Sequence, residues 1–437
     1  MSKHFFTLSL LCCAQFLFAQ VSTFIHLDQF GYWPDAEKVA VLSDPQVGFN
    51  AADSYSPAST LELRSASTDN VIYSGSPQAF NGGQTDASSG DRGWWFDFSS
   101  VSTPGSYYVY APINDERSAF FEIRDNPYHD ILVAAGRMYF YNRCNAPKAA
   151  PYAEANWTDG NNFLNPLQDA NCRYIFDPGN AALEKDLRGG WFDAGDYNKY
   201  VTFTEETLHN LLAAYEENPG AFGDNWNIPE SGNGIPDLLD EIKWELDWML
   251  KMINSDGSAH IKMGSQNFSE NSASPPSNNF DQRFYGPTCS SASAASASVL
   301  SHAALVLQGI EGLAGYAATL SDNAVRTFAY ALDRFESGTL ETNCDDGSII
   351  AGDADRNEQQ QLESLLAASF YLRALTAEGS YEQFFQDQYA NTTPMINNFW
   401  GGDQLFVQDA LINYLQLNSG SPTVQHAIQT SVSNAVN

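Results

Sequence analysis

Twelve residues near the middle of the chain read Gly189-Gly190-Trp191-Phe192-Asp193-Ala194-Gly195-Asp196-Tyr197-Asn198-Lys199-Tyr200. They place two carboxylates, Asp193 and Asp196, three residues apart in a stretch that contains flexible glycines and several aromatic residues. An isolated pair with this spacing is more often a helix cap or a solvated surface. The flanking aromatics favour a sugar site instead, because carboxylates bind hydroxyl groups and aromatic rings stack on the C–H faces of sugars. The pair therefore predicts a site that holds and deprotonates water beside a sugar ring.

The same stretch resembles the W-H-D-A-G-D-Y-x-K-Y segment of glycoside hydrolase family 9, the inverting cellulases. A second run, from Ile228 to Leu250, also resembles that family, through Ser231-Gly232-Asn233-Gly234-Ile235-Pro236-Asp237. The resemblance implies that Asp196 is the general base and that Asp193 helps to hold the attacking water. It further implies an endoglucanase that cleaves β-1,4-glucans with inversion, on an (α/α)6 barrel of six helix pairs.

The remaining aromatic residues that we predict to bind the sugar come from this motif and from loops. The predicted substrate-binding residues are Trp191, Tyr197, Tyr200, Trp226 and Tyr285. Trp244 and Trp248 lie four residues apart on one predicted helix, a spacing that favours the core.

Residues 125–437 show the periodicity of helices joined by long loops. The predicted helices span residues 126–141, 208–217, 236–253, 291–308, 323–335, 361–377, 403–417 and 424–436. This pattern fits a barrel of paired helices whose loops form a groove at one end. The count falls short of six pairs, so we expect an incomplete barrel whose C-terminal helices are missing.

The general acid is the residue that the motif does not supply. An inverting enzyme needs a second carboxyl group about 6.5–9.5 Å from the base. In the family this acid is a Glu near the C-terminus, downstream of a His-His-Arg motif, whereas the last glutamate here is Glu382 and no paired histidine occurs. We therefore expect the acid to lie beyond residue 437. A non-catalytic glucan-binding relative is the alternative, and an exo-acting relative, a cellobiohydrolase or exo-glucosaminidase, is the alternative among enzymes.

Residues 20–124 alternate with period two, as short strands do. Strand candidates at residues 39–42, 60–63, 94–98 and 107–110 are separated by Gly, Pro, Asp and Ser, which predicts a small β-sandwich. The fragments Asp28-Gln29-Phe30-Gly31-Tyr32 and Thr103-Pro104-Gly105-Ser106-Tyr107 resemble the immunoglobulin-like module that precedes the catalytic domain in one branch of the family. The resemblance implies a packed structural neighbour, whereas the residues alone leave a separate binding domain open.

The N-terminus and the charge predict an exported, soluble protein. Residues 1–19 combine Lys3 with an apolar run that is too short to span a bilayer, and so predict a signal peptide cleaved near Ala19. A lipoprotein anchor at Cys12 or Cys13 is the alternative, but Leu11 rather than a small residue precedes Cys12. The formal net charge of −32 argues against nucleic acid and anionic membranes as partners. We expect a monomer that acts on glucan.

The run after Ile228 also offers oxygen ligands. Pro236 begins a predicted helix, and the acidic residues after it favour the positive end of the helix dipole. Four oxygen-bearing residues at the tight Gly-Asn-Gly turn are candidates for calcium, with simple capping as the alternative: Glu230, Asn233, Asp237 and Asp240. A second acidic loop, Asp353-Ala354-Asp355 with Glu358, predicts a solvated surface, because Leu362-Glu363 replaces the Asp-Glu pair of the family. The chemistry itself needs no cofactor.

Cys144 and Cys172 resemble the two thiolate ligands of a structural zinc site in relatives that carry the immunoglobulin-like module. Arg173 and Phe192 stand where those relatives have the two imidazoles. Because the four ligands cannot be completed from these positions, zinc is not expected. In an oxidising compartment we expect a Cys144–Cys172 disulfide, with two free thiols as the alternative. Cys289 and Cys344 are expected to be buried single thiols.

Overall fold

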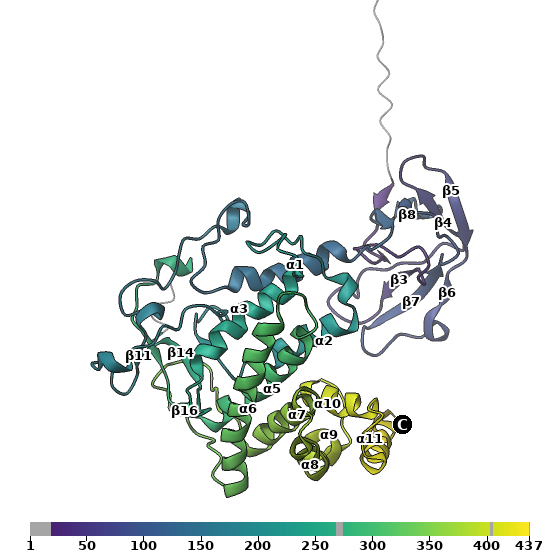
Figure 1. The fold of residues 1–437 in the computed structure, drawn as a ribbon. Coiled ribbons are helices and arrows are strands. Elements are labelled where there is room, and N and C mark those ends of the chain that lie inside the picture. Colours follow the sequence, from purple (N-terminus) through teal and green to yellow (C-terminus); the bar gives the residue numbers. More distant parts are fainter. Residues whose placement is uncertain (1–18, 268–273, 403–404, 437) are drawn as a thin grey trace, which may run out of the picture. The chain divides into compact units, whose positions relative to one another are not determined.

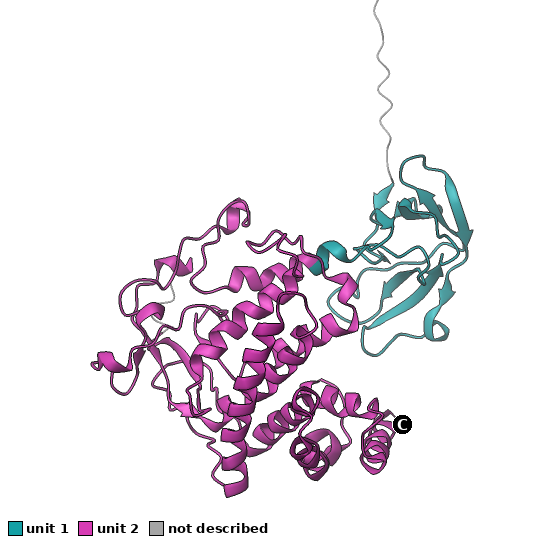
Figure 2. Ribbon diagram, viewed as in Figure 1, with its two compact units in different colours: residues 1–132 teal, residues 133–437 magenta. Residues whose placement is uncertain are grey.

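A computed structural model describes residues 19–267, 274–402 and 405–436 of the chain (Figure 1). The chain forms two compact units, residues 1–132 and 133–437, which Figure 2 colours separately. Residues 1–18 of the predicted signal peptide, which include Cys12 and Cys13, lie outside the described residues.

The first unit is a sandwich of two β-sheets, as its period-two pattern predicts. One sheet has the order β1-β9-β8-β4-β5 with β10 also pairing with β8, and the other has the order β2-β3-β7-β6. The strands of the first sheet are β1 (Gln20–Val21), β4 (Leu61–Ser65), β5 (Val71–Gly75), β8 (Gly105–Ala111), β9 (Glu116–Arg117) and β10 (Phe121–Ile123). The strands of the second sheet are β2 (Ile25–His26), β3 (Val39–Pro45), β6 (Gln78–Ala79) and β7 (Asp91–Asp97). Between the sheets the ring of Tyr32 meets Phe98 and Phe121 edge-on, with centroids 5.5 and 5.4 Å away.

The second unit is mainly helical. Its helices are α1 (His129–Asn142), which begins at the end of the first unit, α2 (Thr204–Glu217), α3 (Asp237–Met252), α5 (Ser290–Leu307), α6 (Ala314–Ser337), α7 (Glu358–Thr376), α8 (Gly379–Gln388), α9 (Thr393–Asn397), α10 (Leu405–Leu415) and α11 (Pro422–Val436). Each predicted helical range overlaps one of these helices. The sequence did not predict α8 and α9, because α8 is polar on average and α9 is little more than one turn.

Helix α5 lies at the centre of this unit. Its many Ser and Ala residues are small enough for α2, α6 and α7 to pack closely around it. By length and hydropathy α5 could cross a membrane, but 89% of it is buried inside the unit. This burial is that of a core helix.

Short strands beside the helices support the loop that holds the two carboxylates. One small sheet has the order β11-β15-β14-β12 and a second pairs β13 with β16. The strands are β11 (Arg173–Tyr174), β12 (Lys199–Tyr200), β13 (Ala259–His260), β14 (Lys262–Ser265), β15 (Arg283–Tyr285) and β16 (Thr288–Cys289). Such short strands show no usable periodicity, so the sequence did not predict them. Strand β12 follows Asp196 almost directly and anchors the end of the loop in the sheet.

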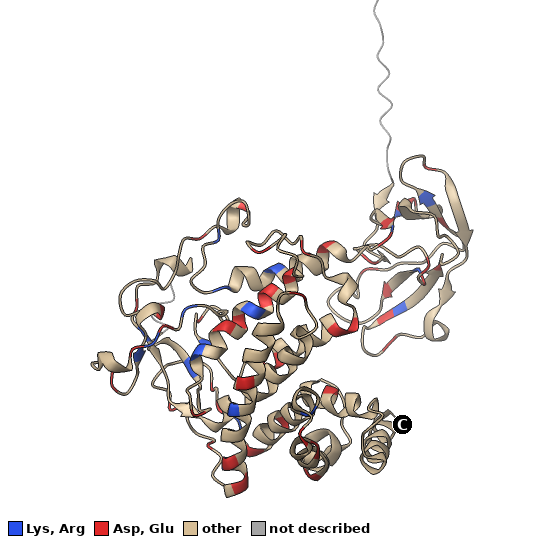
Figure 3. Ribbon diagram, viewed as in Figure 1, with Lys and Arg blue, Asp and Glu red and all other residues tan. Residues whose placement is uncertain are grey.

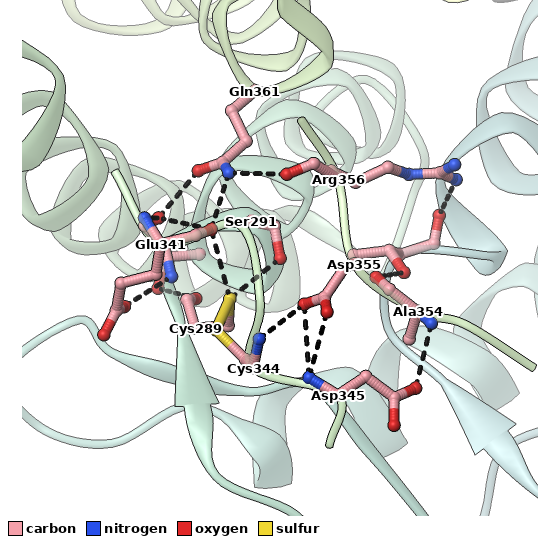
Figure 4. Close-up of a disulfide and its surroundings, with 12 residues drawn as sticks. Cys289, Ser291, Glu341, Cys344, Asp345, Ala354, Asp355, Arg356 and Gln361 are labelled. Atoms are coloured by element: carbon pink, nitrogen blue, oxygen red, sulfur yellow. Dashed lines mark hydrogen bonds between the residues drawn. A yellow bond between two sulfur atoms is a disulfide. The ribbon is translucent and has the colours of Figure 1, made fainter. Parts of the chain in front are cut away.

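The described cysteines pair differently from the prediction. Cys289 and Cys344 form a disulfide with Cα atoms 6.0 Å apart, and both Cys144 and Cys172 are free and buried. The disulfide links the start of α5 to the loop that precedes α7 (Figure 4). The prediction of two buried single thiols at Cys289 and Cys344 is therefore wrong, because the fold brings the two loops together.

The predicted Cys144–Cys172 disulfide is also wrong. Cys144 packs with Phe163 and Phe192, whereas Cys172 belongs to the main core of the helical unit. The Cys144 thiol donates to Asp169 Oδ2 over 3.2 Å instead. Both thiols lie near the same buried charges, Asp169, Lys199 and Arg283, and both remain free.

Candidate active site

Asp193 and Asp196 lie in a loop that closes on itself and leads into β12. The Asp193 N–H donates to the Asn198 carbonyl over 3.0 Å, and the Asn198 N–H donates to Asp196 Oδ1 over 3.2 Å. The hydroxyl of Tyr200 donates to Asp196 Oδ2 over 2.7 Å and lies 2.9 Å from the Ala351 carbonyl. Asp193 is exposed and Asp196 is half-buried. The loop therefore presents both carboxylates to solvent, with Asp196 oriented from behind by Tyr200.

Two fully buried cations hold this loop in place. Lys199 Nζ donates to the carbonyls of Leu187 and Gly189 over 2.9 and 2.7 Å, and pairs with Asp169 at 3.0 Å. Arg283 pairs with the other oxygen of Asp169 at 3.0 Å and donates to the Tyr197 carbonyl over 2.7 Å. Burial opposes ionisation of Asp169, but the charges of Lys199 and Arg283 lower the pKa of its carboxyl. Because Lys199 and Arg283 both pair with Asp169, these ion pairs offset part of the free-energy cost of burying the three charges.

The segment before the two carboxylates rests on α3, a helix with charged residues along its length (Figure 3). The Trp191 N–H donates to Glu245 Oε2 over 2.5 Å. Burial raises the pKa of Glu245 to about 8, so its carboxyl is mainly neutral at pH 7. Gly190 has φ +76°, and a Cβ there would lie 2.8 Å from the Trp248 ring, so the position requires glycine.

A pocket with aromatic walls opens beside Asp193. Its lining includes Tyr139, Trp191, Phe192, Tyr200 and Phe203. The rings of Tyr139 and Trp191 lie 4.7 Å apart, and those of Tyr200 and Phe203 stack at 4.4 Å. Burial and the charge of Asp196 raise the pKa of Asp193. Among the described residues that line the pocket, Asp193 is the one carboxylic acid.

The structure brings three of the five predicted sugar-binding aromatics to the carboxylates. Trp191 and Tyr200 line the pocket, and Tyr197 lies in the loop itself with its ring 5.1 Å from Phe192. Trp226 and Tyr285 do not line this pocket and are 1% and 2% exposed, so their binding to sugar stays a prediction.

The side chains of Trp226 and Tyr285 are buried by contacts within the fold. Trp226 packs its ring against Gly136 of α1, where a Cβ would come within 2.2 Å of the indole. The Tyr285 hydroxyl donates to the Leu183 carbonyl over 2.5 Å. Trp226 is thus packed against α1, and Tyr285 lies in strand β15 with its hydroxyl bonded to the backbone.

The four calcium candidates are held by hydrogen bonds to other residues. Glu230 accepts from Arg143 over 2.9 Å, Asn233 donates to Asp240 over 3.0 Å, and Asp237 accepts from the Ser231 hydroxyl over 2.9 Å. Within residues 19–267, 274–402 and 405–436, no cluster of possible metal ligands includes these carboxylates. The N-cap residue of α3 is Pro236 and no side chain caps the helix there, so the capping alternative is not confirmed and calcium stays a prediction.

The second acidic loop is structural rather than simply solvated. Asp355 accepts the backbone N–H groups of Cys344 and Asp345 over 2.8 and 3.2 Å. Asn357 and Gln360 form a capping box at the start of α7. These bonds fix the loop that carries Ala351.

The described cysteines do not fit a zinc site. Burial raises the pKa of Cys144 to about 12 and raises that of Cys172 as well. Arg173 pairs with Glu184 at 3.1 Å. In the described part of the chain, the one trio with ligand atoms close together is Cys289, Glu341 and Cys344, and its disulfide leaves no thiolate.

Sequence reasoning missed the buried Lys262. Its ammonium is 2.6 Å from Asp345 Oδ2 and 3.3 Å from the carbonyls of both Ala351 and Gly352. A single lysine among the apolar residues 259–263 is a weak signal for such a buried ion pair. Lys262 joins the loop that contains Ala351 to strand β14.

A helical unit that presents two carboxylates beside an aromatic-walled pocket has the architecture of a glycoside hydrolase. The chain belongs to glycosyl hydrolase family 9, whose family model matches residues 128–436. Residues 20–116 match the cellulase N-terminal ig-like domain.

Known relatives agree with this assignment. Endoglucanase D of Acetivibrio thermocellus is 37% identical over 205 residues, which are 45% of this chain and 31% of that protein. Cellodextrinase of Butyrivibrio fibrisolvens is 25% identical over 359 residues, which are 81% of this chain and 59% of that protein. The matches therefore span about a third to three fifths of these relatives.

Solved structures show the same fold. The crystal structure of a metagenome-derived glycoside hydrolase family 9 endoglucanase superposes with a TM-score of 0.75 at 26% identity, over 94% of this chain and 71% of that one. A Bacteroides ovatus family 9 structure gives a TM-score of 0.74 at 21% identity, over 94% and 72%. The two-unit arrangement of a β-rich domain followed by a helical domain is thus shared, and it agrees with an (α/α)6 fold.

Proposed function

We propose that this protein is an endoglucanase that cleaves β-1,4-glucosidic bonds of cellulose or a related β-glucan with inversion. The observation that carries the proposal is the loop in which Tyr200 orients Asp196 beside Asp193 and the aromatic pocket. Relatives named as endoglucanases support the substrate class. Neither a metal nor a cofactor takes part in the proposed step.

In the proposed reaction, Asp196 removes a proton from a water molecule that attacks the anomeric carbon. The hydrogen bonds from Tyr200 and the Asn198 N–H fix both Asp196 oxygens, which leaves their remaining lone pairs for the water. Asp193, whose N–H is bonded to the Asn198 carbonyl in the same loop, helps to hold the same water. Attack opposite the leaving group inverts the anomeric centre.

The proton donor to the leaving oxygen is the unassigned part of this mechanism. Asp193 is the one acid among the described pocket residues, so we infer that the donor comes from outside that lining. The same observation favours a second candidate function, a glucan-binding protein without turnover. A third candidate is exo-action, supported by the match to a cellulose 1,4-beta-cellobiosidase of Acetivibrio thermocellus.

The deciding experiment is hydrolysis of cellohexaose followed by reducing-sugar release and NMR of the product anomer. We expect the α-anomer from the wild type and a loss of turnover of about a hundredfold or more in Asp196→Ala, because the general base is removed. Asp333→Ala, which removes an exposed carboxylate on α6, is the control and should leave the rate unchanged. Products of internal cleavage, rather than cellobiose alone, distinguish endo-action from exo-action.

Other results would redirect the proposal. A β-anomer would contradict inversion, and equal rates in the wild type and Asp196→Ala would remove Asp196 from the chemistry. Binding of cellohexaose without turnover would favour the non-catalytic candidate.

We also propose that the protein is exported through its N-terminal signal peptide and acts as a monomer. The Cys289–Cys344 disulfide supports export, because disulfides persist mainly in oxidising compartments. Fractionation of cells that express the gene, with size-exclusion chromatography of the exported product, tests both statements. Recovery of the protein in the cytosol would contradict export, and elution as a larger species would contradict the monomer.

A further inference from the structure

Trp157 is the most exposed tryptophan in the described part of the chain, with 69% of its surface accessible. An aromatic side chain this large is seldom left in water without a binding role when it lines a cavity. Trp157 lines a groove of about 760 Å³, a volume in the range of ligand sites, about 300–1,000 Å³. The groove is therefore large enough for sugar units.

The turn that carries Trp157 is held rigidly. The Trp157 N–H donates to the Glu154 carbonyl over 2.9 Å. The Glu154 carboxylate is fixed in turn by Arg137 at 3.2 Å and by the Tyr141 hydroxyl. Arg137 also donates to the Tyr152 carbonyl over 2.7 Å, so α1 braces this turn. Binding at Trp157 would lose little conformational entropy because the backbone beneath the ring is already ordered.

The groove adjoins the pocket at Asp193. Met138 and Phe192 line both cavities, and Phe192 directly precedes Asp193 in the chain. A glucan chain that left the pocket past Phe192 would enter the groove. The occupant that this adjacency indicates is the same polysaccharide chain.

Polar side chains also line the groove. Asn162 is one of them; it is only 2% exposed and its Oδ1 accepts from the Asn145 N–H over 2.7 Å. Asp159, whose carboxylate accepts from the N–H groups of Gly160 and Ser277, adds a fixed acceptor.

We propose that this groove binds further glucosyl units of the β-1,4-glucan, with the Trp157 indole stacked on one of them. The inference rests on the proposed function, because it takes the occupant of the Asp193 pocket to be a β-glucan. It assigns to residues 154–162 the role of extending the binding cleft away from the carboxylates.

Isothermal titration calorimetry with cellohexaose tests the proposal, because binding does not require turnover. Trp157→Ala should weaken binding by about tenfold or more, as loss of a central aromatic contact commonly does. Trp157→Phe keeps a stacking ring and should bind more tightly than Trp157→Ala. Phe176→Ala removes another exposed aromatic of the same unit, 53% accessible, and should bind like the wild type.

Tryptophan fluorescence separates contact from a structural effect. The emission change that cellohexaose causes in the wild type should be smaller in Trp157→Phe, although this variant still binds. Unchanged affinity in a folded Trp157→Ala would overturn the inference and leave the proposed function intact. A wild type that neither binds nor cleaves cellohexaose would overturn both.

Discussion

The hydroxyl of Tyr200 connects the catalytic carboxylate to the rest of the fold. It is within hydrogen-bond distance of Asp196 Oδ2 and of the Ala351 carbonyl, and it accepts from Asn198 Nδ2 over 3.1 Å. Because Tyr200 itself is 1% exposed, the ring cannot move aside without disturbing the core. One buried hydroxyl therefore sets the orientation of Asp196.

We predict that Tyr200→Phe lowers kcat on cellohexaose about tenfold to a hundredfold, since a misoriented base loses most of its advantage. KM should change much less, because the ring that walls the pocket is kept. Tyr139→Phe, which removes a hydroxyl from another residue of the pocket, is the matched control. Equal kcat values in Tyr200→Phe and the wild type would show that the Asp196 orientation does not depend on this bond.

Residue types alone predicted the two carboxylates but not the surroundings of the aromatics. Asp193 and Asp196 could be located because their spacing, glycines and flanking rings occur together in one short stretch. Trp226 and Tyr285 were expected in the groove because their sequence indicated loops, yet Tyr285 lies in strand β15 and tertiary packing buries both. Tyr200 was expected to touch sugar, and its main observed contact is with Asp196.

At the scale of elements, the loop between α6 and α7 supports the site from behind. The Cys289–Cys344 disulfide and the Asp355 carboxylate hold its first part, as Figure 4 shows. The Lys262–Asp345 ion pair, at 2.6 Å, holds its middle. The Ala351 carbonyl that contacts the Tyr200 hydroxyl lies on this loop. The contacts that hold the loop therefore also help to position Asp196, through Tyr200.

We predict that Cys289→Ala/Cys344→Ala lowers the free energy of unfolding by about 4 kcal/mol, from the chain entropy of a cross-link between residues 55 apart. Urea denaturation of the wild type and the double variant measures this difference. A reducing agent should destabilise the wild type by a similar amount and leave the double variant unchanged. Equal stability of the two proteins would show that the loop is held without the disulfide.

Elements were predictable where their pattern was long. The helices with strong periodicity were found from the sequence, whereas strands of two to four residues and the single-turn α9 were not. Four cysteines in the described chain allow three pairings, and spacing does not choose among them. The correct pair depends on which loops the helices bring together, and sequence order does not reveal that.

For the whole molecule, the balance of charge makes stability depend on pH. The formal net charge of −32 produces repulsion that grows as acids ionise. Burial also raises the pKa of Glu205 to about 7 and that of Glu245 to about 8, from ordinary values of 4.5. The folded protein therefore retains protons between pH 4.5 and these values that the unfolded chain releases.

The sign of the effect follows from this difference in bound protons. Stability falls with rising pH wherever the folded state binds more protons than the unfolded state. Each such group lowers the free energy of unfolding by up to ~1.4 kcal/mol per pH unit in its window. Salt screens the surface repulsion but hardly affects the cost of ionising a buried carboxyl.

We predict that Glu245→Gln reduces the loss of stability between about pH 5 and about pH 8, because a neutral amide replaces a carboxyl that must otherwise ionise in the core. Urea denaturation at both pH values, in high salt, isolates the buried group from the net charge. Glu336→Gln removes an exposed carboxylate at the end of α6 and should leave the pH dependence unchanged. If Glu245→Gln and Glu336→Gln lost the same free energy of unfolding as the pH rises, the prediction would be wrong. The surface charge, rather than the buried carboxyl that accepts from Trp191, would then make the protein less stable at higher pH.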